Sequence, residues 1–276
     1  MTQIQTNTPC CLWDCHTHTC FSGDSDADIS DMIEAAISNG LSGICFTDHL
    51  DLDYPYEEPG MFELPMDYYE QIKSLADAYQ NRIDICYGVE TGLAPGLNDR
   101  LDAFLDRHPY DFVIGSSHLV HGKDPYFPDY FEGRSDKEAF LEYFSSILEN
   151  VKDCRNFDVY GHIDYVVRYS PNKAANYSYK QYQEILDEIL MTLINLSKGI
   201  EINTSGFRSG LDFPNPHPDI IRRYKELGGE IITIGSDAHK PQDVAKDFHL
   251  AKDILLSCGF TYYSVFKDRK PTFIQL

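Results

Sequence analysis

The chain has 276 residues, and its 44 acidic against 23 basic side chains give a formal net charge of −21. A surface this acidic repels phosphate backbones, which argues against nucleic acid as a partner. No run approaches the roughly 18 consecutive apolar residues of a membrane helix, so we expect no membrane span. The first residues, MTQIQTNTPCC, lack the basic and apolar regions of a signal peptide, and we therefore expect a cytoplasmic protein.

In chain order, short apolar runs alternate with longer segments of helical periodicity. The predicted strands are residues 12–15, 42–47, 83–89, 111–117, 157–161, 199–203 and 229–236. The predicted helices are residues 29–39, 67–80, 98–106, 136–152, 179–197, 217–227 and 243–257. Such alternation is typical of parallel strands joined by helical crossovers. No repeat or linker interrupts it, and we predict a single α/β domain over residues 1–276.

Two architectures fit this alternation, an open doubly wound sheet and a closed barrel. The open sheet usually carries a glycine-rich phosphate loop after its first strand, but the chain has no G-x-G-x-x-G or Walker loop. The segment DCHTHT stands in that place instead. A barrel predicts functional residues at the C-terminal ends of many strands, which is the pattern found here.

Side chains that can bind a metal follow nearly every predicted strand. Six of the ten histidines lie there, namely His16, His18, His49, His118, His162 and His239. Carboxylates accompany them, namely Asp48, Asp51, Glu90, Asp164, Glu201 and Asp237. In a barrel these strand ends meet at one mouth, where so many imidazoles and carboxylates need cations to neutralise them. Because one ion takes only about three or four protein ligands, we predict more than one ion.

The ligand types narrow the choice of metal. Imidazole and carboxylate groups without thiolate suit Zn²⁺, Mn²⁺ or Fe²⁺ better than Ca²⁺ or Mg²⁺. Glu90 stands alone at its strand end and is the natural carboxylate to bridge two ions. The cysteines near the start, Cys10, Cys11, Cys15 and Cys20, have no C-x-x-C spacing, so we expect small buried side chains there rather than a zinc site.

The remaining histidines lie in different surroundings. We expect His108, His217 and His249, which fall in loops or helices, to be surface or capping residues. His121 follows His118 closely, and we leave two interpretations open for it, a surface position or a contact with substrate.

The segments DCHTHTCFSGDS, FTDHLD, GVETG, GSSH, GHIDY and GSDAH, in this order, resemble the PHP (polymerase and histidinol phosphatase) superfamily. The resemblance runs from about residue 12 to residue 240. It is closest to the stand-alone histidinol-phosphate phosphatases, which share the FS-x-DS and FTDH motifs. The resemblance implies a distorted (β/α)7 TIM-like barrel that holds three divalent transition-metal ions.

The resemblance also implies which residues hold each ion. The first ion would be held by His16, His18, Glu90 and Asp237, the second by Asp24, His49 and His239, and the third by Glu90, His118 and His162. Asp24 departs from the family pattern, because many members have a histidine at this position. The resemblance therefore leaves the identity of the second metal open.

The resemblance points to arginines for a substrate phosphate, and Arg168 and Arg208 follow strand ends here. A guanidinium fork grips phosphate oxygens in two places. We also expect Ser117 to contact the substrate. Among the metal ligands, Asp237 and His239 would act in catalysis by holding a hydroxide that attacks phosphorus.

The function that this implies is metal-dependent hydrolysis of a phosphate monoester, above all L-histidinol phosphate to L-histidinol and phosphate in histidine biosynthesis. The proton donor to the leaving group stays open between Asp51, Asp164 and a metal-bound water. The alternatives are another small-molecule or nucleotide phosphoesterase of the superfamily, a metal-dependent amidohydrolase, and a metal-stabilised binding domain. The sequence does not specify the oligomeric state.

Overall fold

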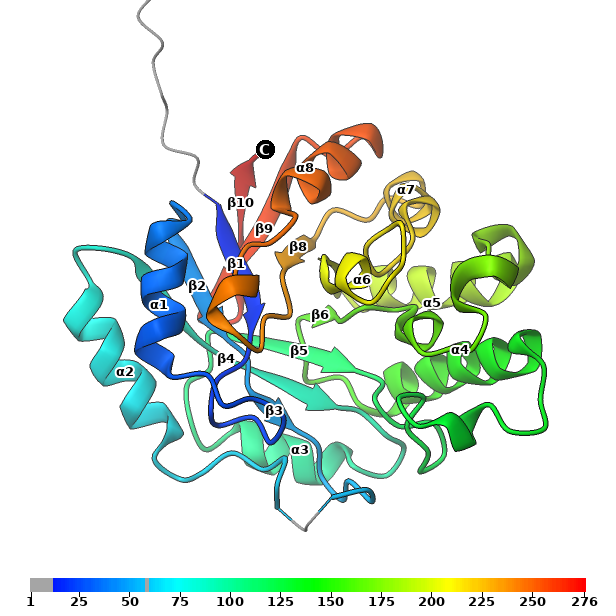
Figure 1. Cartoon of the computed structure of the whole chain (residues 1–276), viewed down its shortest axis with the longest axis horizontal. Helices are drawn as coiled ribbons and strands as arrows, with labels where there is room; N and C mark the ends of the chain where they lie inside the picture. The colour runs from blue at the N-terminus through cyan, green and yellow to red at the C-terminus, as the bar shows by residue number, and fades with distance from the viewer. Residues whose placement is uncertain (1–11, 58–59) are drawn as a thin grey trace, which may run out of the picture.

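In the computed structural model, which describes residues 12–57 and 60–276, parallel strands form a nearly closed barrel with helices around it (Figure 1). In order around the barrel, the strands are β1 (Trp13–Thr17), β2 (Gly43–Phe46), β4 (Asp84–Gly92), β5 (Phe112–Ser116), β6 (Val159–Tyr160), β7 (Gly199–Asn203) and β8 (Ile232–Gly235). A short strand, β3 (His49–Leu50), pairs with the end of β4. The predicted distorted seven-stranded barrel is thereby confirmed.

The barrel closes between its first and last strands, at their C-terminal ends. Thr17 forms a parallel bridge with Ala238. The backbone N–H of His18 donates to the carbonyl of Ala238 at 2.9 Å, and that of Asp237 donates to the carbonyl of His16 at 2.8 Å. Because these bonds join the two ends of the sheet, segments more than two hundred residues apart meet at one rim.

The helices cover the outside of the strands (Figure 1). They are α1 (Ile29–Ser38), α2 (Tyr68–Tyr79), α3 (Asn98–Leu105), α4 (Asp136–Asp153), α5 (Gln183–Asn195), the short α6 (Ser205–Arg208), α7 (Pro218–Glu226) and α8 (Phe248–Ser257). In α1 the buried residues Ile29, Met32, Ile33 and Ala36 recur at helical spacing, so one face packs on the barrel. Asp28 begins this helix, since its carboxylate accepts the backbone N–H of Ser30.

Two predicted helices begin later than expected. A 3₁₀ turn, Tyr179–Tyr182, precedes α5, and another, Pro241–Asp243, precedes α8. Asp247 has a φ of 61°, a left-handed conformation that an α-helix cannot pass through, so α8 starts only at Phe248.

A C-terminal β-hairpin, β9 (Tyr262–Lys267) and β10 (Lys270–Gln275), was not expected from the sequence. Its turn lies against the loops that lead into β5 and β6, because Arg269 donates from Nε to Asp158 Oδ2 at 2.6 Å and from its backbone N–H to the carbonyl of Asp111 at 2.9 Å. The hairpin therefore covers the N-terminal end of the barrel and leaves the C-terminal end open.

The cysteine prediction can be followed for part of the cluster. Cys10 and Cys11 lie outside the described residues. Cys15 is buried as expected, but the expectation is wrong for Cys20, which is exposed because it lies in a turn beyond the end of β1; both are free thiols. Within residues 12–57 and 60–276, no helix is long and apolar enough to cross a membrane.

Candidate functional site

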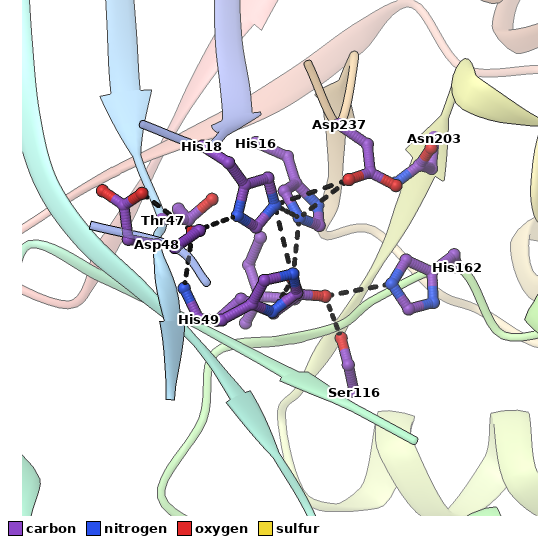
Figure 2. Close-up of polar contacts among 12 residues, drawn as sticks. His16, His18, Thr47, Asp48, His49, Ser116, His162, Asn203 and Asp237 are labelled. Carbon is purple, nitrogen blue, oxygen red and sulfur yellow. Dashed lines mark hydrogen bonds and ion pairs between the residues drawn. The ribbon is translucent and has the colours of Figure 1, made fainter. Parts of the chain in front are cut away.

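The six strand-end histidines of the sequence analysis meet at the C-terminal end of the barrel, and we refer to them as the histidine cluster. Figure 2 labels four of them, and the rings of His16, His18 and His49 lie close together there. They come from β1, the residue just after β1, and β3. The cluster forms because the C-terminal ends of the parallel strands meet at one rim.

Glu90 lies at the centre of the cluster. The ring nitrogens within 3.5 Å of its carboxylate belong to His16, His18, His49, His118 and His162. Ser116 donates its hydroxyl to Glu90 Oε1 at 2.6 Å. Burial opposes ionisation of Glu90, but the facing imidazoles outweigh it and hold its pKa well below the usual value.

The three ligand groups implied by the resemblance are each brought together. In the first, the Nε2 atoms of His16 and His18 lie 3.0 Å apart, and Asp237 Oδ1 lies 3.4 Å from His18 Nε2. In the second, Asp24 Oδ2 lies 3.0 Å from His239 Nε2 and 3.7 Å from His49 Nε2.

The third group joins Glu90 to two further imidazoles. Glu90 Oε1 lies 2.9 Å from His162 Nε2 and 3.3 Å from His118 Nε2. His18 also lies beside the second group, stacked on His239 with ring centres 4.1 Å apart. Glu90 thus belongs to two groups, in the position of a bridging carboxylate.

The outward-facing nitrogens of the cluster are held by hydrogen-bond acceptors. His16 Nδ1 lies 2.6 Å from Glu201 Oε1, and His118 Nδ1 lies 2.7 Å from Asp51 Oδ1. An acceptor at Nδ1 keeps the proton on that nitrogen and directs the other ring nitrogen inward. Both carboxylates were recognised as strand-end residues from the sequence, but no role was predicted for Glu201.

Ser22 holds His18 in a similar way. Its hydroxyl donates to Asp48 Oδ1 at 2.9 Å and accepts the backbone N–H of His49 at 3.1 Å. The hydroxyl proton is thereby used, so the contact of 2.9 Å to His18 Nδ1 is one in which His18 donates. Burial, together with the nearby imidazoles of His239 and His49, lowers the pKa of His18 to about 3, which makes it a neutral ring with a free Nε2.

The donor set fits metal ions. Two ring nitrogens of the cluster, His49 Nδ1 and His162 Nδ1, are buried without a hydrogen-bond partner. Buried polar atoms normally have partners, so unpaired ring nitrogens in such a cluster fit a site that binds cations. Inward-facing lone pairs and carboxylates packed at 3 to 4 Å repel one another unless positive charge lies between them.

A cavity of about 490 Å³ opens beside the cluster. One side is lined by ligand candidates together with Arg168 and Arg208. The lining also includes the aromatic side chains Tyr54, Phe62, Tyr126, Phe127, Tyr165 and Tyr169, and we refer to the part of the wall that they form as the aromatic end. The cavity therefore combines a cationic surface with an aromatic one, next to the histidine cluster.

The two arginines differ in how they are held. Arg208 Nη2 donates to the carbonyls of Ser236 at 2.8 Å and Asp237 at 3.0 Å, whereas its buried Nη1 has no partner. Arg168 is almost fully buried and donates from Nη1 to Asp237 Oδ2 at 3.1 Å. Both line the cavity, where their unused N–H groups can bind an anion.

The aromatic end contains one buried carboxylate. Asp124 is 4% exposed, and its Oδ2 accepts the hydroxyl of Tyr54 at 2.6 Å while its Oδ1 accepts the backbone N–H of Tyr126 at 2.7 Å. Burial raises its pKa above the usual value. No positive side chain pairs with it among the contacts of the described residues, so it offers a site for a cationic group. Asp124 was not predicted from the sequence, because it lies in a loop well beyond the end of β5.

The prediction for Ser117 is corrected by the structure. Its hydroxyl is buried between Tyr160 Oη at 2.5 Å and Asn150 Nδ2 at 2.7 Å, and Asn150 belongs to α4 outside the barrel. Successive side chains of a strand point to opposite faces, so Ser116 faces Glu90 and Ser117 faces the helices. Ser117 does not line the cavity.

Other open assignments are also resolved by position. Asp164 lies behind the cavity wall and bonds to protein groups, so it is not placed to protonate a leaving group. His121 is exposed beside Glu142 and Glu149 on α4, away from the cavity. His217 caps α7, as expected for a structural residue.

Comparisons with known proteins agree with this geometry. The PHP domain family model matches residues 14–205. A histidinol-phosphatase from Lactococcus lactis subsp. lactis is 32% identical, over 93% of this chain and 95% of its own length. A protein of Clostridium acetobutylicum, named a probable histidinol-phosphatase, is also 32% identical, over 96% of this chain and 97% of its own length.

Solved structures show the same similarity. The crystal structure of a histidinol phosphate phosphatase from Lactococcus lactis subsp. lactis, in complex with zinc, L-histidinol and phosphate, superimposes with a TM-score of 0.88 at 31% sequence identity. The match covers 95% of this chain and 99% of that one.

Proposed function

This chain belongs to the PHP domain family, and from that premise we propose that it is a metal-dependent phosphomonoesterase which hydrolyses L-histidinol phosphate to L-histidinol and phosphate. The observation that carries the proposal is the single cavity in which the histidine cluster, two arginines and an aromatic end with a buried carboxylate lie together. We assign the reaction to histidine biosynthesis in the cytoplasm. The relatives support this choice of substrate by their names and by the L-histidinol and phosphate bound in one of them.

The residues fit three divalent transition-metal ions, zinc, manganese or iron. The proposed ligands are His16, His18, Asp24, His49, Glu90, His118, His162, Asp237 and His239. When bound, such ions supply Lewis acidity toward the phosphoryl group and neutralise charge that develops there. Glu90 would be shared between two of the ions, because imidazoles of two groups face its two oxygens.

The chain's own residues bind and orient the phosphate. Arg208 Nη1, buried and without a partner, is available to donate to a phosphate oxygen at the cavity wall. The guanidinium of Arg168 faces the same cavity. At partly buried positions these N–H groups stabilise negative charge more strongly than they would in bulk solvent.

The other half of the substrate matches the aromatic end. L-Histidinol carries an amine and an imidazole, and both can be positively charged near neutral pH. Asp124 offers a carboxylate for such a group, and the rings of Tyr126 and Phe127 offer apolar surface for an imidazole. A substrate with an anionic and a cationic end would thus lie along the cavity.

Phosphate release from a panel of esters tests the proposal. Purified protein, reconstituted with Zn²⁺ or Mn²⁺, should release phosphate from L-histidinol phosphate with a kcat/KM at least tenfold above that for nucleoside monophosphates or p-nitrophenyl phosphate. Preference for a nucleotide would place the protein among other phosphoesterases of the family. Amide hydrolysis without any phosphate release would contradict the proposal outright.

A further inference from the structure

Behind the cavity wall, a chain of buried polar side chains links two residues without a role in the proposed function, Asp164 and Asn215, to Arg168 and Asp237 of the site. It runs from Asp164 through Asn215 and Arg168 to Asp237. None of these four residues is more than 8% exposed. Buried polar groups are costly unless each is fully paired, so this arrangement calls for a specific role.

Arg168 is held on three sides. Its Nε donates to Asn215 Oδ1 at 2.6 Å, its Nη2 donates to Asn203 Oδ1 at 3.1 Å, and its Nη1 donates to Asp237 Oδ2 at 3.1 Å. A guanidinium has five N–H groups, so these bonds leave one on each terminal nitrogen. Since Arg168 lines the cavity, the two remaining N–H groups are available to an anion there.

The shortest of the three hydrogen bonds of Arg168 is the one that Asn215 accepts, and the side chain of Asn215 is itself held by Asp164. Its Nδ2 donates to Asp164 Oδ1 at 2.5 Å. Asp164 Oδ2 accepts the hydroxyl of Tyr177 at 2.9 Å and the backbone N–H of His217 at 2.8 Å. Because Asp164 Oδ1 accepts from the amide nitrogen of Asn215, the amide oxygen of Asn215 is turned toward Arg168.

The backbone adds rigidity at the same point. The N–H of Asn215 donates to the carbonyl of Asn203 at 2.9 Å, and the N–H of Asn203 donates to the carbonyl of Asn215 at 2.7 Å. The loop that carries Asn215 is thereby paired with the end of β7. Both amide oxygens that grip Arg168 sit on one rigid backbone unit.

We propose that Asn215, anchored by Asp164, is a positioning residue that sets the Arg168 guanidinium so that it holds Asp237 and grips the substrate phosphate at the same time. The inference rests on the proposed function, because it assumes a phosphate in the cavity. It assigns Asp164 a place two residues behind the substrate, in contrast to the proton-donor role that the sequence left open.

The test is a double-mutant cycle on the metal-reconstituted protein, with inorganic phosphate as the ligand. Asn215→Ala should weaken phosphate binding about tenfold, the usual size for a lost hydrogen bond to a charged group. The KM for L-histidinol phosphate should rise by a similar factor, with a smaller change in kcat. In an Arg168→Ala background the same change should alter phosphate affinity less than about twofold, because a residue that acts through Arg168 has nothing left to orient.

Asn150→Ala is the matched control. Asn150 is as buried as Asn215, and its Nδ2 bonds to Ser117 rather than to the cavity wall. This variant should lower the melting temperature and leave phosphate affinity within about twofold of the wild type. Asn215→Leu, which keeps a branched side chain of similar shape and loses the same hydrogen bonds, replaces Asn215→Ala if the latter does not fold.

The outcomes distinguish failure of the positioning role of Asn215 from failure of the proposed function. If the wild type binds phosphate and hydrolyses the substrate, but the Asn215 variants bind phosphate as well as Asn150→Ala does, the inference is wrong and the proposed function stands. Equal effects of the Asn215 change with and without Arg168 would also overturn it. If the wild type neither binds phosphate nor hydrolyses L-histidinol phosphate, the proposed function fails and this inference fails with it.

Discussion

At the scale of single residues, the site depends on side chains that hold other side chains. Acceptors at the Nδ1 atoms of His16, His18 and His118 direct the opposite nitrogen of each ring inward. The metal-ligand types could be read from the sequence, because histidines and carboxylates recur after strands. The sequence does not reveal which of the neighbouring serines Ser116 and Ser117 faces the site, because both are polar and only the direction in which β5 turns each side chain decides between them.

Removing one such acceptor should weaken metal binding. We predict that Asp51→Ala lowers affinity for the most weakly held zinc ion by about 10- to 100-fold, because His118 loses the partner that fixes its ring. Competition with a chromophoric chelator measures this. Asp53→Ala is the matched control, since Asp53 is an exposed carboxylate paired with Arg100 on the surface. Equal zinc affinity in the two variants would rule out the orienting role of Asp51.

Asp124 should contribute to substrate selection. We predict that Asp124→Asn raises the KM for L-histidinol phosphate by about 10- to 100-fold, because a charge-assisted hydrogen bond to the amine is lost. The KM for p-nitrophenyl phosphate, which has no cationic group, should change less than about twofold. Steady-state kinetics on both esters decides the matter, and a parallel rise in both KM values would show that Asp124 only supports the loop.

At the scale of secondary-structure elements, the pairing of β1 with the end of β8 determines the geometry of the rim. The strand–helix order was predictable because apolar periodicity and strand-end polar residues coincide along the chain. The start of α8 was not predictable, since no glycine or asparagine marks the left-handed conformation that Asp247 adopts. The hairpin β9–β10 was missed because its turn, Asp268–Arg269, contains no glycine or asparagine, and Pro271 disfavours a strand.

The side chain of Asp14, in β1, holds the segment that follows β8 against β1. Its fully buried carboxylate accepts the backbone N–H groups of Ser236 and Ala245, both at 2.9 Å. Burial raises the pKa of Asp14 to about 6, although the hydrogen bonds from Ser236 and Ala245 oppose the rise. A carboxyl whose pKa is higher in the folded state binds its proton more tightly there, so its contribution to stability is larger below pH 4 and is lost as pH rises through 6.

A comparison of Asp14→Ala with the wild type tests this contribution. We predict that the loss of unfolding free energy caused by the substitution is greater at pH 4 than at pH 7, by on the order of 3 kcal/mol at most. Urea unfolding of the metal-free protein at both pH values measures it. If the substitution lowers the unfolding free energy equally at both pH values, or more at pH 7, Asp14 stays ionised in the folded barrel.

At the scale of the whole molecule, the barrel gathers ligands from nearly every strand at one end, while the C-terminal hairpin covers the other. The convergence followed from the sequence, because a closed parallel barrel has only one C-terminal rim. The cavity beside the rim could not be predicted from the sequence, since its aromatic end comes from loops. The course of these loops depends on contacts such as the stacking of Tyr56 on Phe127, with ring centres 4.2 Å apart. The fold therefore explains why the candidate metal ligands meet, and the loops form the part of the wall that we propose selects the substrate.

Titration of the metal-free protein with Zn²⁺ or Mn²⁺, with metal content and phosphate release from L-histidinol phosphate followed together, tests the central claim most directly. We predict no turnover without metal, and activity that rises to a plateau as about three ions bind per chain. Full activity in protein that elemental analysis shows to be free of metal would contradict the account. So would binding of the ions with no phosphate release at any metal content.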